Sequence, residues 1–185
     1  MAEKIDFRAV ADQFGTRSHE RAMREDPVLW AKDRLGDHLW SKQREVMQSL
    51  RDNKRTLVAS CHASGKSHTA SRAIGWWLDV HPHDPTETRV ITTAPSWNQV
   101  KNVMWAYVED LQSKANMPGR ITGKAEWTFP GFKTATAFGR KPADYDESTF
   151  QGFHSTYVLA VVDEAGGVAE NIFTSVETIT TNKHA

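Results

Sequence analysis

One stretch of the chain predicts most of its fold: Thr56-Leu-Val-Ala-Ser-Cys-His-Ala-Ser-Gly-Lys-Ser67. Its apolar beginning, residues 56–60, is typical of a buried strand, and the residues from Ser67 to Val80 are typical of a helix. A strand, a loop ending in Gly-Lys-Ser and a helix form the arrangement of a phosphate-binding P-loop. In that arrangement the loop N–H groups and the helix N-terminus point at one anion, which the helix dipole favours.

Two side chains at the end of this loop have chemical roles in such an arrangement. Lys66 would reach the β- and γ-phosphates of a nucleotide, and the Ser67 hydroxyl would bind Mg²⁺. Ser60 stands where the pattern G-x-x-x-x-G-K-[ST] has its first glycine, so the opening of the loop is expected to differ. The other predicted nucleotide-binding positions of the loop are His62, Ala63, Ser64 and Gly65. For His62, simple exposure on the loop is the alternative.

A second apolar run, Tyr157-Val-Leu-Ala-Val-Val-Asp163-Glu164, ends in two carboxylates. Its unbroken apolar character predicts a central parallel strand that is covered on both faces. Ligands of open α/β sheets bind at the carboxyl ends of the strands, so both carboxylates would face a ligand there. Asp163 would hold Mg²⁺ through water, and Glu164 would orient and deprotonate an attacking water. A strand that merely ends in charged residues as it reaches the surface is the alternative.

The remaining patterns predict helices and strands in alternation. Strands that alternate with helices indicate an α/β fold with a mostly parallel central sheet flanked by helices. Residues 1–26 are charged and are predicted to be an arm or a packing helix. Other predicted elements are two helices within 27–53 broken near Gly36, a strand at 89–93, a long helix capped by Ser96, a hairpin strand at 127–129, and strands at 134–138 and 176–181.

Composition narrows the class of protein without identifying a function. The chain has 185 residues, enough for one domain with a substantial core. It carries 23 basic and 23 acidic residues, so DNA would have to meet a local basic stripe rather than a general positive field. The single cysteine, Cys61, fits a reducing compartment. No apolar run approaches the length of a membrane span, and a cytoplasmic protein is the default expectation.

Six motifs, in their order along the chain, resemble the start of phage terminase large subunits. The resemblance covers residue 27 to the C-terminus, and the ordered set is more specific than any one motif. The motifs are Pro27-Val-Leu-Trp-Ala-Lys-Asp-Arg-Leu-Gly36, Leu39-Trp-Ser-Lys-Gln-Arg-Glu-Val-Met47, Val58-Ala-Ser-Cys-His-Ala-Ser-Gly-Lys-Ser67, Thr92-Thr-Ala-Pro-Ser-Trp-Asn-Gln-Val100, Phe150-Gln-Gly-Phe-His154 and Val162-Asp-Glu-Ala165.

The resemblance implies an ATPase with ATP and Mg²⁺ as cofactors, in a P-loop NTPase fold of the additional-strand, catalytic-glutamate type. Gln43 matches a glutamine that reads adenine through its amide, although it could also be an exposed helix residue. Thr181 and Asn182 lie in a candidate coupling motif, residues 180–182. Such motors also need an arginine finger, for which Arg140 is the candidate. Rival positions for the finger are Arg72 and Arg120.

The family pairs an N-terminal packaging ATPase with a C-terminal nuclease. The resemblance therefore implies an ATPase domain over residues 27–185, truncated at its C-terminal end and without the nuclease. It implies double-stranded DNA, the portal protein and the small terminase subunit as partners, in a ring of copies docked on a procapsid in the host cytoplasm, with a monomer possible in isolation. A helicase-like or repair ATPase, and a nucleotide-binding fragment without turnover, are the alternatives.

Overall fold

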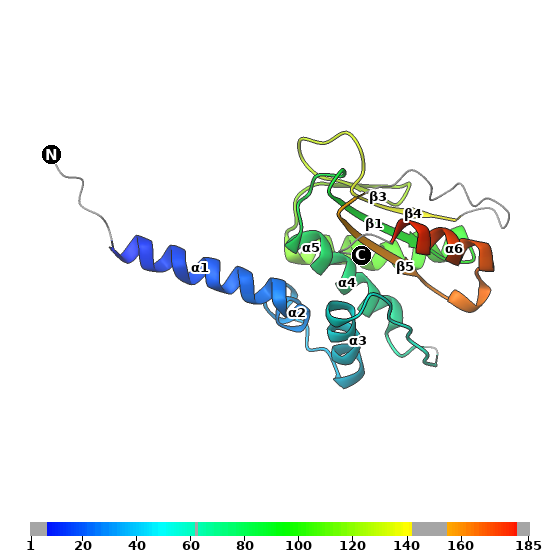
Figure 1. Cartoon of the computed structure of the whole chain (residues 1–185), viewed down its shortest axis with the longest axis horizontal. Helices are drawn as coiled ribbons and strands as arrows, with labels where there is room; N and C mark the ends of the chain where they lie inside the picture. The colour runs from blue at the N-terminus through cyan, green and yellow to red at the C-terminus, as the bar shows by residue number, and fades with distance from the viewer. Residues whose placement is uncertain (1–6, 62, 142–154, 181–185) are drawn as a thin grey trace.

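A mixed sheet organises the part of the chain that the computed structural model describes, residues 7–61, 63–141 and 155–180. Its strands are β1 (Thr88–Thr93), β2 (Arg120–Thr122), β3 (Glu126–Thr128), β4 (Ala137–Arg140) and β5 (Tyr157–Val162). Their order across the sheet is β2-β3-β4-β1-β5. Helices flank this five-stranded sheet (Figure 1), which confirms the α/β class.

The sheet is mixed, and the prediction of a mostly parallel sheet was wrong. β1 runs parallel to both β4 and β5, whereas β3 is antiparallel to both β2 and β4. The antiparallel part follows from the short connection between β2 and β3, because a chain that reverses within a few residues can only pair antiparallel. The predicted hairpin strand at 127–129 is β3, and the predicted strand at 134–138 lies slightly later, as β4.

The described helices surround this sheet in chain order. They are α1 (Phe7–Glu25), α2 (Pro27–Leu35), α3 (Ser41–Asp52), α4 (Lys66–Val80), a π-helical segment (Gln99–Met104) that continues into α5 (Trp105–Ala115), a 3₁₀ turn (Ala165–Gly167) and α6 (Glu170–Ile179). In Figure 1, α1 projects away from the sheet and its last residues meet α2. None of the helices in the described ranges has the length and apolar character needed to cross a membrane.

Local signals account for where the helices begin and end. The Asp26 carboxylate accepts hydrogen bonds from the backbone N–H groups of Val28 and Leu29, at 2.9 and 3.2 Å, which caps α2. Gly36 ends α2 in the left-handed conformation, with φ of 67°. The predicted break between two helices is therefore confirmed. The predicted cap before the long helix is also confirmed, since Ser96 Oγ accepts from the backbone N–H of Gln99 at 3.2 Å.

Alternate residues of β1 enter two apolar clusters on opposite faces of the sheet. Val90 belongs to the larger cluster, which includes residues of α2, α4 and α5, such as Trp30 and Leu111. Ile91 belongs to a smaller cluster with residues of β4 and α6. Gly75 on α4 sits so close to the Leu111 and Trp30 side chains that a Cβ there would lie 2.6–2.8 Å from them. The P-loop candidate thus begins a helix that is tightly packed against the core.

The predicted strand at 176–181 was wrong, because α6 continues to Ile179. The buried residues of α6, Ile172, Ser175 and Ile179, recur at helical spacing. Ile172 and Ile179 pack in the cluster that contains Ile91. The β-branched composition at 176–181 favours a strand locally, and the packing of this helical face overrides that preference.

The predicted strand at 56–60 was also wrong. Within the described residues this segment joins no strand, and Leu57 is 88% exposed. β5 is correspondingly the last strand of the described sheet rather than a central one, and most of its residues are only partly buried. The two segments nevertheless line the same cavity, of about 870 Å³. Arg55 and Glu177 form an ion pair of 3.0 Å that links the start of the segment to α6.

Candidate nucleotide-binding site

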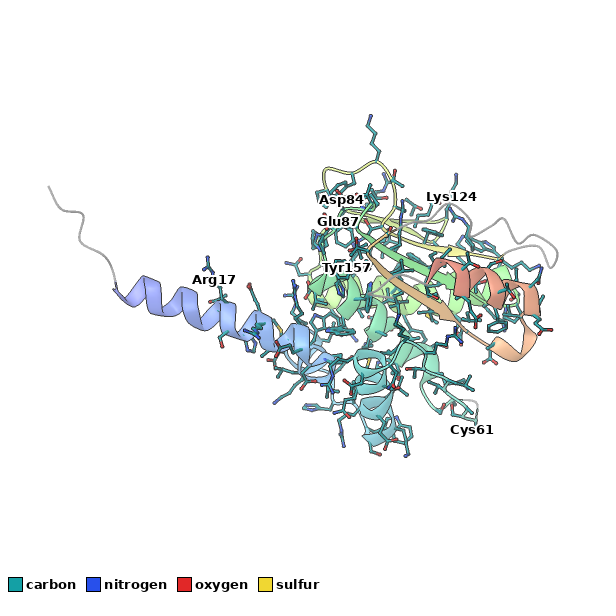
Figure 2. The ribbon with its side chains drawn as sticks, viewed as in Figure 1. Arg17, Cys61, Asp84, Glu87, Lys124 and Tyr157 are labelled. Atoms are coloured by element: carbon teal, nitrogen blue, oxygen red, sulfur yellow. The ribbon has the colours of Figure 1, made fainter. Side chains whose placement is uncertain are left out.

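The Gly-Lys-Ser loop, residues 60–67, turns directly into the N-terminus of α4. Gly65 is the N-cap of α4 with φ of 86°, and Ala63 also has a positive φ, 60°. Lys66 folds back over the loop, where its ammonium donates to the carbonyl oxygens of Ser60 and Cys61 at 3.2 and 3.0 Å. Cys61 itself is exposed, at the outer end of the loop (Figure 2). A lysine held above a helix N-terminus is a suitable arrangement for an anion.

Ser60 replaces the glycine of the P-loop pattern without backbone strain. It is not among the described non-glycine residues that have a positive φ. Its hydroxyl instead forms a 2.6 Å hydrogen bond with the Ser64 hydroxyl across the loop. The substitution is therefore compatible with a closed loop, and the expected cost of a positive φ at Ser60 does not arise.

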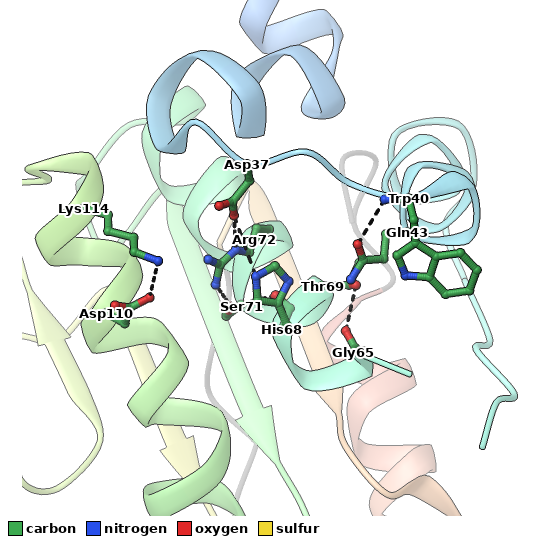
Figure 3. Close-up of polar contacts among 10 residues, drawn as sticks. All are labelled: Asp37, Trp40, Gln43, Gly65, His68, Thr69, Ser71, Arg72, Asp110 and Lys114. Carbon is green, nitrogen blue, oxygen red and sulfur yellow. Dashed lines mark hydrogen bonds and ion pairs between the residues drawn. The ribbon is translucent and has the colours of Figure 1, made fainter. Parts of the chain in front are cut away.

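Gly65 lies against Gln43 of α3, as Figure 3 shows. A Cβ on residue 65 would lie 2.8 Å from Gln43 Nε2, so only glycine leaves room for this approach. The other end of the Gln43 amide accepts a 3.3 Å hydrogen bond from the backbone N–H of Trp40. The structure thus brings Gln43 to the loop, as the resemblance implies.

Ser67 and Asp163 meet although 96 residues separate them in the chain. Ser67 Oγ donates a 2.9 Å hydrogen bond to Asp163 Oδ2. Helix α4 supplies the serine, and the carboxyl end of β5 supplies the aspartate. A hydroxyl and a carboxylate are oxygen ligands of the kind that Mg²⁺ prefers, with water and phosphate completing its shell. These two residues fit the predicted Mg²⁺ site.

Glu164 follows Asp163 in an unusual backbone conformation. Its φ and ψ are 49° and 47°, the left-handed region that non-glycine residues seldom adopt. Its N–H donates to Asp163 Oδ1 at 3.0 Å. The residue is exposed and lines the same cavity as Lys66. Strained backbone of this kind is concentrated at functional sites, which agrees with a working role for this carboxylate.

The 870 Å³ cavity collects residues from three separate parts of the chain. Its volume lies within the usual range for small-molecule sites, about 300–1,000 Å³. Sequence reasoning missed Trp40, whose indole is 50% exposed at this cavity. Its position three residues before Gln43 was the available signal. The polar and aromatic residues at the cavity are Trp40, Gln43, Ser60, Ser64, Lys66, Asp163 and Glu164.

The arginines lie elsewhere. Arg140 ends β4, where it donates to Glu126 Oε1 at 2.9 Å and lies 4.9 Å from the centre of the Phe138 ring. It does not line the cavity. Arg72 is 1% exposed and bound to Asp37, so its guanidinium is already engaged. The structure therefore does not bring the candidate finger, Arg140, to the loop.

Some of the predicted site residues lie outside the described residues, namely His62, Thr181 and Asn182. Within the described ranges there is no group of three or more His, Cys, Asp or Glu side chains that would hold a metal ion. An Mg²⁺ ion at Ser67 and Asp163 would therefore depend on phosphate and water for its other ligands. His68, next to Ser67, has a lowered pKa, first because of burial and then because of the Arg72 charge.

No protein-family model, curated protein or solved structure matches this chain. The geometry of the loop, the two carboxylates and the cavity is accordingly the basis for any functional conclusion.

Proposed function

We propose that this chain binds and hydrolyses ATP as the ATPase part of a motor that moves double-stranded DNA into a viral procapsid. The observation that carries the proposal is the 2.9 Å hydrogen bond between Ser67 Oγ and Asp163 Oδ2. It joins the end of the Gly-Lys-Ser loop to the end of the Asp-Glu strand. A P-loop ATPase needs these two groups together, because both hold the same Mg²⁺.

The proposed fold is a P-loop NTPase with an additional strand. In such a fold one more strand would lie beside the strand that ends in Asp-Glu. The position of β5 at the edge of the described sheet supports this proposal. So does the cavity lined by both β5 and residues 56–60.

Three side chains would act on the nucleotide. Lys66 now donates to two neutral carbonyl oxygens, and charged phosphate oxygens are stronger acceptors that would take over these bonds. Glu164 is exposed at the cavity, where its carboxylate can take a proton from an attacking water. Gln43, against Gly65, would donate to or accept from the adenine edge. Mg²⁺, when bound, neutralises charge that develops on the phosphates.

The motor part of the proposal is supported by the ordered set of motifs. The chain would contact DNA mainly at phosphates through Lys and Arg, without reading sequence. One observation favours the simpler alternative, nucleotide binding without turnover. The segment that leads into the loop is exposed and unpaired in the described structure, so the loop is supported mainly from the side of α4.

Phosphate release from ATP, measured with and without duplex DNA, tests the proposal. Glu164→Gln should lower turnover about 10²- to 10⁴-fold, the usual contribution of a general base, while ATP affinity is retained. Lys66→Ala should weaken ATP binding. Lys54→Ala is the matched control, since Lys54 is exposed and does not line the cavity.

The outcomes separate the alternatives. Stimulation by DNA that disappears in Glu164→Gln supports the motor. ATP binding without turnover under either condition supports the module without turnover. If Lys66→Ala binds ATP as tightly as the unchanged protein, the nucleotide site is wrong.

A further inference from the structure

The segment that carries Trp40 and Gln43 is anchored at its start by Asp37. This residue follows Gly36, the left-handed end of α2, and its N–H donates to the Ala31 carbonyl at 3.2 Å. Residues 37–40 then lead directly into α3, which begins at Ser41. The position of Asp37 therefore sets where α3, and Gln43 on its first turn, begins.

The anchor is an ion pair with a buried arginine of α4 (Figure 3). Arg72 Nε donates to Asp37 Oδ2 at 2.7 Å, and Arg72 Nη1 donates to Ser71 Oγ at 2.9 Å. The Arg72 side chain is 1% exposed, and that of Asp37 is 18% exposed. A buried charge that loses its partner is strongly disfavoured, so Asp37 cannot move away from α4 without a large penalty.

Arg72 and the Gly-Lys-Ser loop belong to one rigid element. α4 begins at Lys66, and Ser67 and Arg72 are little more than one turn apart on it. The pair thus ties the start of the Trp40–Gln43 segment to the same helix that would hold the phosphates. His68, on the same helix, lies farther from Asp37, with 3.8 Å between Nε2 and Oδ2.

Two further contacts hold the path from Asp37 to Gln43. Arg44 Nη1 donates to the Leu39 carbonyl at 2.7 Å, and the Trp40 N–H donates to Gln43 Oε1 at 3.3 Å. Gln43 Nε2 then ends against Gly65. Every step from the buried pair to the amide is therefore fixed by a contact.

We propose that the Asp37–Arg72 ion pair is a positioning device that sets the distance between the nucleobase-reading residues, Trp40 and Gln43, and the phosphate-binding loop. It thereby determines how well the site discriminates adenine from guanine nucleotides. This inference rests on the proposed nucleotide site. Neither Asp37 nor Arg72 lines the cavity, so both act through the segment and not by contact with the ligand.

The chain offers a matched control pair between the same two regions. Asp79, near the other end of α4, accepts from Arg34 Nε and Trp30 Nε1 of α2, at 3.0 and 2.7 Å. Its side chain is 19% exposed, close to the value for Asp37. Loss of this carboxylate would loosen the same helices without touching the segment that carries Gln43.

The test compares Asp37→Asn with Asp79→Asn by the dissociation constants of ATP, GTP and tripolyphosphate, each with Mg²⁺. In Asp37→Asn the preference for ATP over GTP should fall about tenfold, the equivalent of one well-placed hydrogen bond. Tripolyphosphate affinity should stay within about twofold, because the phosphate loop is unchanged. Asp79→Asn should keep the preference of the unchanged protein.

Asp37→Glu provides a variant that keeps Arg72 paired, in case Asp37→Asn does not fold. It should lose discrimination as well, because the longer side chain displaces the segment. A preference for ATP that survives in the folded variants, or a parallel loss of tripolyphosphate affinity, overturns the inference while the nucleotide site stands. If the unchanged protein binds neither nucleotide, the proposed function itself is wrong and this inference with it.

Discussion

β1 and residues 56–60 have similar sequences and different fates. Both are short runs rich in Thr, Val and other apolar residues, and both were predicted to be strands. β1 lies between β4 and β5, paired on both edges, and nearly all of it is buried. The segment at 56–60 pairs with no described strand and exposes Leu57 and Val58. A strand-like composition therefore became a strand only where partners lay on both sides.

The contacts that hold the two segments differ in the same way. Val90 and Ile91 of β1 enter clusters on opposite faces of the sheet. Residues 56–60 are held near the start, by the Arg55–Glu177 ion pair and a 2.9 Å hydrogen bond between the hydroxyls of Thr56 and Ser49. An extended segment fixed only at its ends gains little from its apolar side chains, because they remain in water.

Amide hydrogen exchange should show the largest difference between the two segments. The amides of β1 should exchange only on global unfolding, since they are buried between paired strands. The amides of residues 57–60 should exchange nearly as fast as in an unfolded chain. For a domain of ordinary stability, roughly 5–15 kcal/mol, the ratio of the two rates is at least about a thousandfold. Protection of residues 57–60 comparable to that of β1 would show that the segment is paired in solution.

Truncation of one apolar side chain in each segment should differ next most. Ile91→Ala should lower the free energy of unfolding by about 2–5 kcal/mol, because it leaves a cavity between β1 and α6. Leu57→Ala should change it by less than about 0.5 kcal/mol, as for other exposed positions. Urea denaturation of both variants gives the comparison. An equal loss in the two would mean that Leu57 is buried in solution.

Polar groups of the two segments provide a smaller contrast. Thr92→Val in β1 should cost about 1–3 kcal/mol, since it leaves the buried Trp105 Nε1 without its 2.8 Å acceptor. Thr56→Val, which removes the hydroxyl that bonds Ser49, should cost less because water can replace the bond. Thermal denaturation of the two variants measures the difference, and a neutral Thr92→Val would contradict the role of this hydrogen bond.

The approach to β1 should also make stability depend weakly on pH. Burial lowers the pKa of His83, whose ring stacks on Phe129 at 3.9 Å. Between the folded pKa and the unfolded value of about 6.5, only the unfolded chain binds the proton, so stability falls as pH falls below about 6.5. His83→Phe keeps an aromatic ring on Phe129 and removes the titration.

The measurement is the free energy of unfolding of both proteins across about pH 5–7.5, a range that spans the histidine titration. The difference between the two curves isolates His83 from the other histidines. It should grow as the pH falls, in favour of His83→Phe. A constant difference across the range would show that His83 titrates normally in the folded protein.

The candidate site was predictable where the signal is a motif. Lys66, Ser67, Asp163 and Glu164 were named from residue type and spacing, and the fold brings the two motifs to one cavity. Trp40 was missed because exposed aromatic residues have no periodic signature. The Asp37–Arg72 pair could not be predicted either, because nothing in the 35 residues between the two indicates that they meet.

The sequence by itself determined the elements whose causes are local. The cap at Asp26, the left-handed Gly36 and the reciprocal Ser96–Gln99 bonds act within a few residues, so they can be read directly from the chain. Only the tertiary structure decided the fate of residues 56–60, the helical state of residues 176–179, the edge position of β5 and the mixed order of the sheet. These depend on which distant segments supply hydrogen bonds and apolar cover, and a local pattern carries no information about its partners.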